Sequence, residues 1–148
     1  MNYLLDSNIL LVYLRDIGLK TYIEDNYAPF DPPNIPIISI VTVGELKALA
    51  LKNNWGPTKL HALELLLQQH IIADINAEDV IERYAEIDAF SQGRLKNRPL
   101  NMSARNMGKN DIWIAATAAV IGAKLITIDN DFDHLNGAFL EVIKIDNK

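Results

Sequence analysis

The chain has 148 residues, of which 49% are hydrophobic and 22% are charged, so it is long enough for one domain with a buried core and too apolar for intrinsic disorder. It contains no cysteine, which excludes disulfides, thiolate-bound metals and thiol nucleophiles. Its net charge of −5 argues against a protein that coats nucleic acid by bulk electrostatic attraction.

Apolar runs alternate with amphipathic segments along the chain. In chain order, we expect a strand at 2–5, a helix at 9–14, a strand at 37–41, helices at 43–52 and 58–70, a strand at 71–75, a helix that begins at 76, a helix at 111–121, a strand at 124–128 and an edge strand within 139–145. Apolar strands separated by helices are typical of a parallel sheet covered on both faces. The sequence therefore predicts one α/β domain, residues 1–148, with a mainly parallel central sheet.

Four acidic residues are expected at one edge of this sheet. Asp6 and Asp129 directly follow strands, whereas Glu45 and Asp111 lie in the first turns of helices. Connecting helices run antiparallel to parallel strands, so these helix N-termini face the carboxyl ends of the strands. Each acid alone has a structural explanation, as a helix cap, a partner of the helix dipole or a turn residue.

The four acids together indicate a bound cation. Two carboxylates about 4 Å apart repel by about 4 kcal/mol at an effective dielectric constant near 20, so a cluster needs a proton or a cation to neutralise it. Oxygen ligands favour Mg²⁺ or Mn²⁺. The histidines are scattered, and we expect them at surface or capping positions rather than on a metal: His61, His70 and His134.

Four segments around these acids carry a family pattern: YLLDSN at 3–8, SIVTVGEL at 39–46, NDIWIAA at 110–116 and LITIDNDF at 125–132. Together they closely resemble the PIN-domain ribonucleases, and most of all the VapC-type toxins of toxin–antitoxin pairs. The resemblance covers essentially the whole chain in order. It implies a three-layer α/β/α sandwich and Mg²⁺- or Mn²⁺-dependent hydrolysis of RNA phosphodiester bonds.

The resemblance also assigns roles by position. By this resemblance the catalytic residues are expected to be Asp6, Glu45, Asp111 and Asp129. Three of them are expected to bind the metal: Asp6, Asp111 and Asp129. Polar support is expected from Ser7, Asn8, Thr127 and Asp131, and Asp131 is an alternative to Asp129 as the fourth acid. As a hypothesis, the metal polarises the scissile phosphate and activates a water that Glu45 orients or deprotonates.

Residues 91–110 form a basic segment without any Asp or Glu. Five of the fourteen basic residues lie there and are candidate RNA contacts: Arg94, Lys96, Arg98, Arg105 and Lys109. They would hold phosphates that the acidic site repels. A solvated connector or an antitoxin contact is a nearly equal alternative for this segment.

The resemblance further implies an antitoxin partner and a homodimer, with the apolar helices near 9–14 and 43–70 as candidate surfaces. Two other functions stay open: a free-standing RNA-processing nuclease, and a non-catalytic PIN-like module whose acids dock a partner's arginines. No apolar run approaches the roughly 20 residues that span a bilayer, and the first residues lack the basic start of a secretory signal. We therefore expect a cytoplasmic protein that does not enter a membrane.

Overall fold

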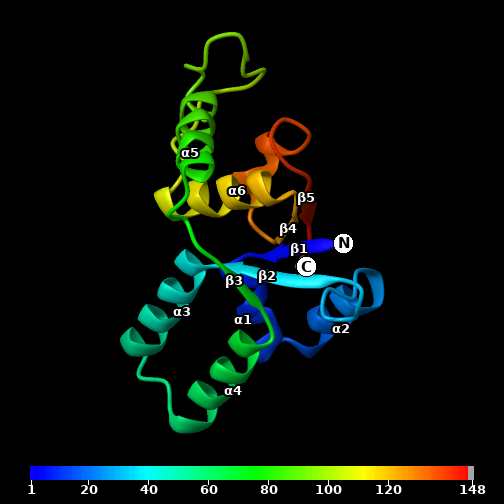
Figure 1. Ribbon diagram of the computed structural model, residues 1–148. Helices are drawn as coiled ribbons and strands as arrows, with labels where there is room; N and C mark the ends of the chain where they lie inside the picture. The colour runs from blue at the N-terminus through cyan, green and yellow to red at the C-terminus, as the bar shows by residue number, and fades with distance from the viewer. Residues whose placement is uncertain (147–148) are drawn as a thin grey trace.

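A computed structural model describes residues 1–146, in which five strands form one sheet in the order β3-β2-β1-β4-β5 (Figure 1). The strands are β1 (Asn2–Leu5), β2 (Ile35–Ser39), β3 (Ile71–Ala73), β4 (Lys124–Thr127) and β5 (Val142–Lys144). Each neighbouring pair is parallel. The predicted α/β class is therefore confirmed, and the edge strand expected within 139–145 is β5.

Helices cover both faces of the sheet and complete three layers. One face carries α1 (Ser7–Arg15), α2 (Ile17–Asn26), α3 (Ile40–Lys52) and α4 (Pro57–Gln68), and the other carries α5 (Glu78–Ser91), α6 (Lys109–Ile121) and the short 3-10 helix η1 (Asn130–Leu135) (Figure 1). Successive residues of β1 point to opposite faces, so Leu4 packs in the α5–α6 core while Tyr3 and Leu5 pack in the α1–α4 core. None of the helices within residues 1–146 combines the length and hydrophobicity needed to cross a bilayer.

Two observed helices were not predicted, α2 and η1. In α2 only Ile23 is buried, so the segment lacks the apolar stripe by which helices are recognised. Each of the two helices begins after an aspartate that caps it: the carboxylate of Asp16 accepts from Leu19 N at 3.1 Å, and that of Asp129 from Asp131 N at 2.9 Å. Capping therefore marks these helices, whereas hydrophobic periodicity does not.

The boundary between β2 and α3 lies earlier than predicted. The Oγ of Ser39 accepts from Val41 N at 3.1 Å and starts α3 at Ile40, although the apolar run through Val41 is typical of a strand. Glu45 consequently lies in the second turn of α3 rather than in the first. The helix predicted to begin at 76 instead begins at Glu78, after Ala77 and without a side-chain cap.

The prediction that the histidines take surface or capping positions is wrong for one of the three residues, His134. His61 is exposed, but His70 and His134 are buried. The Nδ1 of His70 hydrogen bonds with Leu66 O at 2.8 Å and caps the last turn of α4, whereas the Nε2 of His134 bonds with Ser91 Oγ at 2.7 Å. Each imidazole packs as part of a core, which its sequence context does not reveal.

The order of the strands determines where a site lies. The chain proceeds from β1 to β2 and β3 on one side, then returns to place β4 and β5 on the other side of β1. In open parallel sheets, the crevice at such a reversal, beyond the carboxyl ends of the strands, is the usual place for a ligand. Here it lies between the ends of β1 and β4, next to Asp6 and Asp129.

Candidate functional site

Asp6 is the most buried of the clustered acids, with only 3% of its surface exposed. Its Oδ1 accepts from Ser7 N at 2.8 Å and caps α1, and its Oδ2 accepts from Thr127 Oγ1 at 2.8 Å. Burial raises the pKa of Asp6 to about 6, although both hydrogen bonds favour the ionised form. The nearby charges of Glu45 and Asp129 make a smaller contribution to this raised pKa than burial does.

Thr127, the last residue of β4, connects two of the acids. Its hydroxyl donates to Asp6 and accepts from Asp129 N at 3.0 Å. The carboxylate of Asp129 in turn accepts from Asp131 N, so the turn after β4 is fixed by its own side chains. This places Asp129 and Asp131 beside the carboxylate that follows β1.

Asp111 lies in the first turn of α6 and joins the same cluster. Burial raises its pKa to about 7, and the neighbouring carboxylates raise it as well, in decreasing order Asp6, Asp129, Glu45 and Asp131. Four segments remote in sequence therefore bring their acids close enough to disfavour one another's charge. The structure brings together all four acids that the sequence predicts to converge, and with them Asp131, which the sequence predicts as polar support or as an alternative fourth acid.

Three of these carboxylates are spaced for one ion. Asp111, Asp129 and Asp131 each offer an oxygen within 4.8 Å of the others. All three donors are carboxylate oxygens, the ligands that Mg²⁺ and Mn²⁺ prefer, so the residues fit a hard divalent cation. Of the predicted ligands, Asp111 and Asp129 belong to this group, whereas Asp6 is held by Ser7 and Thr127 and is coupled to it through charge.

Glu45 is held across the site by the start of α1. Ser7 Oγ donates to Glu45 Oε1 at 2.8 Å, which ties the first residue of α1 to the second turn of α3. A groove of about 620 Å³ begins at this pair and runs between α1 and α3, with Asn8 and Asn110 among its lining residues. The predicted supporting residues Ser7, Asn8 and Thr127 thus all lie next to the acidic cluster.

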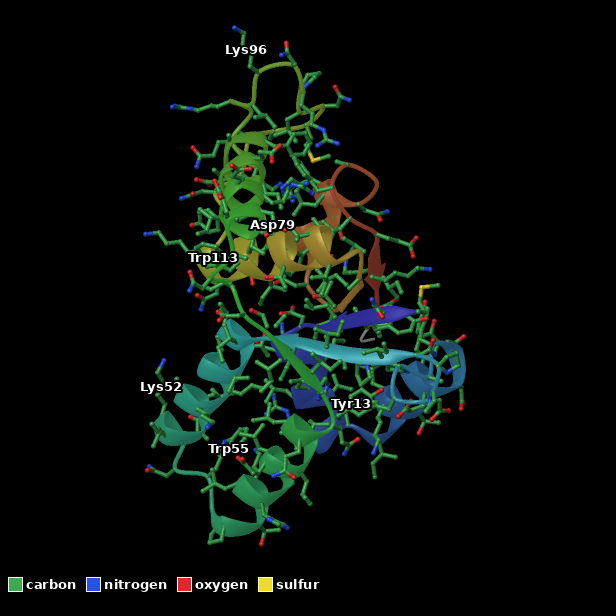
Figure 2. All side chains as sticks on the ribbon, in the orientation of Figure 1. Tyr13, Lys52, Trp55, Asp79, Lys96 and Trp113 are labelled. Carbon is green, nitrogen blue, oxygen red and sulfur yellow. The ribbon has the colours of Figure 1, made fainter. Side chains whose placement is uncertain are left out.

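The five basic residues of segment 91–110 are separated by the fold. Arg98 lies 4.1 Å above the ring of Phe139 and donates to Ala138 O, so it anchors the loop to the chain before β5. Arg105 contacts Met102 Sδ through its guanidinium at 3.6 Å. Arg94 and Lys96 are exposed, and Figure 2 shows Lys96 at the outer tip of the loop beyond α5. Lys109 begins α6, two residues before Asp111.

Comparisons with known proteins agree on one family. The family model for the PIN domain matches residues 3–138. Two proteins named Ribonuclease VapC1, from Haemophilus influenzae strains R2866 and 86-028NP, are each 28% identical to this chain over 127 residues, which cover 86% of both sequences.

Solved structures share the fold. The crystal structure of VapBC2 from Rickettsia felis bound to a promoter DNA fragment contains a chain with a TM-score of 0.76 at 21% identity, and the match covers 99% of this chain and 100% of that one. VapBC-1 from nontypeable Haemophilus influenzae gives a TM-score of 0.71 at 22% identity, covering 97% and 98%. At these identities the likeness concerns the fold alone.

Proposed function

The chain belongs to the PIN-domain family, and on that premise we propose that it is a metal-dependent endoribonuclease and the toxin of a type II toxin–antitoxin pair. The observation that carries the proposal is the convergence of four chain segments on one cluster of acids, in which burial and mutual repulsion raise the pKa of Asp6 and Asp111. Such a cluster is costly to the fold unless it serves a ligand. The relatives named Ribonuclease VapC1 support RNA as the substrate.

We propose Mg²⁺ or Mn²⁺ as the cofactor, held by Asp6, Asp111 and Asp129 with Asp131 as a further ligand. The oxygen-only donors and the 4.8 Å spacing of three of them support this choice. When bound, a divalent cation supplies Lewis-acid polarisation of the scissile phosphate. Thr127 and Ser7 keep Asp6 oriented through the hydrogen bonds described above.

Glu45 is our candidate for the general base. Its Oε1 accepts from Ser7, which fixes the side chain and leaves Oε2 for a proton of the attacking water. The water oxygen forms a bond to phosphorus while Glu45 takes the water's proton. The bond from phosphorus to one ester oxygen of the RNA strand breaks, and that oxygen leaves with the bonding electron pair and takes a proton from solvent water. The basic residues Lys109, Arg94 and Lys96, of which Arg94 and Lys96 lie exposed on the loop, are proposed to hold flanking phosphates.

An apolar pocket between α3 and α4 supports a protein partner. It has a volume of about 440 Å³, contains Trp55, and includes Leu51 and Leu60, which are 81% and 45% exposed. Exposed large apolar side chains beside a pocket are typical of protein-interaction surfaces. We propose that this surface binds an antitoxin or a second copy of the chain in a homodimer. We also propose that the protein acts in the cytoplasm and that its one domain is sufficient for the activity.

Cleavage of total cellular RNA by the purified protein, with Mn²⁺ and with EDTA, tests the enzyme proposal. We expect cleavage only with the metal, loss of cleavage in Asp6→Asn, and a fall in kcat of roughly 100-fold or more in Glu45→Gln because the base is removed. Asp25→Asn removes an exposed carboxylate of α2 and is the matched control, with unchanged activity. Cleavage that persists in Asp6→Asn, or in the wild type with EDTA, would reject the proposed site.

A further inference from the structure

The groove between α1 and α3 has a different character at each end. At one end it begins with Ser7 and Glu45 at the acidic cluster, and at the other end it reaches Lys52, the last residue of α3. Apolar side chains line the stretch between the two ends: Leu11, Val41, Ala48 and Leu49. The groove therefore joins the proposed cleavage site to a positive charge through an apolar channel.

Three polar side chains of the groove have no partner in the structure. Among residues 1–146, the amides of Asn8 and Asn110 make no hydrogen bond, and the ammonium of Lys52 makes no ion pair. Each amide offers both a donor and an acceptor, the combination that the edges of nucleobases require. Figure 2 shows the side chain of Lys52 extending from the outer end of α3.

The geometry of α3 relates the two ends of the groove. Glu45 and Lys52 are seven residues apart, so they lie on the same face two helical turns from each other, about 10 Å along the axis. An acidic cluster repels the phosphates that flank a scissile bond unless a cation nearby attracts them. Lys52 is placed to hold a phosphate a short distance along the strand from the cleaved one.

We infer that this groove is the subsite for the nucleotide that adjoins the cleaved bond of a single-stranded RNA segment. Lys52 holds the phosphate of that nucleotide, the apolar wall receives its unstacked base, and Asn8 and Asn110 bind the base edge. Charge complementarity selects this occupant, because the only charged groups that line the groove in residues 1–146 are Glu45 at the cleavage site and Lys52. The inference rests on the proposed ribonuclease function.

Lys52→Ala and Lys47→Ala form a matched pair for the test. Lys47 lies on the same helix but lines the α3–α4 pocket instead, so both variants lose one exposed lysine from α3. In cleavage of total cellular RNA with Mn²⁺, we expect Lys52→Ala to raise the apparent KM about fivefold to tenfold with kcat nearly unchanged, because a phosphate contact is lost. Lys47→Ala is expected to match the wild type, and Lys52→Arg to restore the KM.

A binding measurement without metal separates this inference from catalysis. In EDTA, a labelled pool of random single-stranded RNA should bind Lys52→Ala less tightly, and the slope of log affinity against log salt should fall by about 1. In the Asn110→Ala variant, sequencing of the cut ends should show a changed preference at the nucleotide beside the cut, since a base contact is lost.

The outcomes distinguish the two proposals. If the wild type cleaves RNA and Lys52→Ala behaves like Lys47→Ala in both assays, the groove inference is wrong while the nuclease proposal stands. If Lys52→Ala binds RNA normally but loses binding to a co-expressed antitoxin, the groove is a protein site and the inference is equally overturned. Absence of any metal-dependent RNA cleavage by the wild type rejects the proposed function itself.

Discussion

Single residues hold the acids in place through hydrogen bonds from groups that carry no charge. The hydroxyl of Thr127 serves both Asp6 and the main chain at Asp129, and the hydroxyl of Ser7 serves Glu45. These bonds join β1, β4, α1 and α3 at one edge of the sheet. They reduce the freedom of the carboxylates before a cation or a substrate arrives, which is the usual means by which a site is preorganised.

Replacing Asp111 by asparagine should stabilise the metal-free protein. The pKa of Asp111 rises from 3.8 to about 7, so between these pH values the folded chain holds a proton that the unfolded chain has released. The folded state then binds more protons than the unfolded state, and stability falls as the pH rises through this window. Asp111→Asn removes that loss, so we expect a gain of about 1–2 kcal/mol at pH near 8 and almost none at pH near 4.

Urea unfolding in EDTA at both pH values measures this difference. Asp25→Asn, which removes an exposed carboxylate outside the cluster, serves as the control and should change stability little at either pH. Equal stability of Asp111→Asn and the wild type at the higher pH would mean that Asp111 is not under electrostatic strain.

At the scale of elements, a buried contact joins three segments behind the acidic site. Ser91, the last residue of α5, hydrogen bonds through Oγ with His134 Nε2 at 2.7 Å and contacts Met107 Sδ at 3.3 Å. His134 belongs to η1, the helix that also carries Asp131, and Met107 precedes α6. Burial, and to a smaller extent the charge of Arg105, lowers the pKa of His134 to about 4, so the ring is neutral at neutral pH.

Removal of the Ser91 hydroxyl should loosen η1. In Ser91→Ala the Nε2 of His134 stays buried without its partner, and its Nδ1 already has none, so we expect a loss of about 1–3 kcal/mol in the free energy of unfolding. A looser η1 should also weaken Mn²⁺ binding, measured by calorimetric titration. Ser103→Ala, at an exposed serine of the neighbouring loop, is the control; if both variants unfold alike, the contact does not hold η1.

For the whole molecule, the net charge of −5 conceals two opposed regions. Acidic residues cluster where β1 and β4 end, and basic residues cluster in the loop between α5 and α6. This loop extends beyond the body of the protein (Figure 1). The loop is not free along its length, since Arg98 stacks on Phe139 and Arg105 N donates to Ser91 O at 2.8 Å. The basic residues of this loop therefore have two roles: some anchor the loop to the rest of the protein, and others face solvent.

Arg98→Ala and Lys96→Ala should separate these two roles. Loss of the stacking and of the hydrogen bond to Ala138 should cost Arg98→Ala about 1 kcal/mol of stability, whereas Lys96→Ala should stay within about 0.5 kcal/mol of the wild type. Thermal unfolding measures the first effect. RNA binding at several salt concentrations measures the role of Lys96. Lys96→Ala should reduce the slope of log affinity against log salt, and an unchanged slope would mean that Lys96 does not contact RNA.

The sequence by itself determined the class of fold and the residues that meet. Alternating apolar runs and helix caps predict a parallel sheet, and in such a sheet the carboxyl ends of the strands lie at one edge, so Asp6 and Asp129 must be neighbours wherever β1 and β4 pair. The family resemblance follows from those same segments and is confirmed over residues 3–138. The catalytic roles of the four acids stay predictions.

Only the tertiary structure decided how the acidic side chains are held and which basic residues stay exposed. The hydrogen bond from Thr127 to Asp6 joins residues 121 positions apart. The stacking of Arg98 on Phe139 joins the loop after α5 to the loop before β5. Neither contact leaves a periodic pattern in the sequence. The sequence leaves open whether Asp129 or Asp131 is the fourth acid, and the turn after β4 places both in the cluster. The groove that ends at Lys52 depends on how α1 packs beside α3. Burial and long-range hydrogen bonds depend on such pairings of distant segments, which local sequence patterns do not encode.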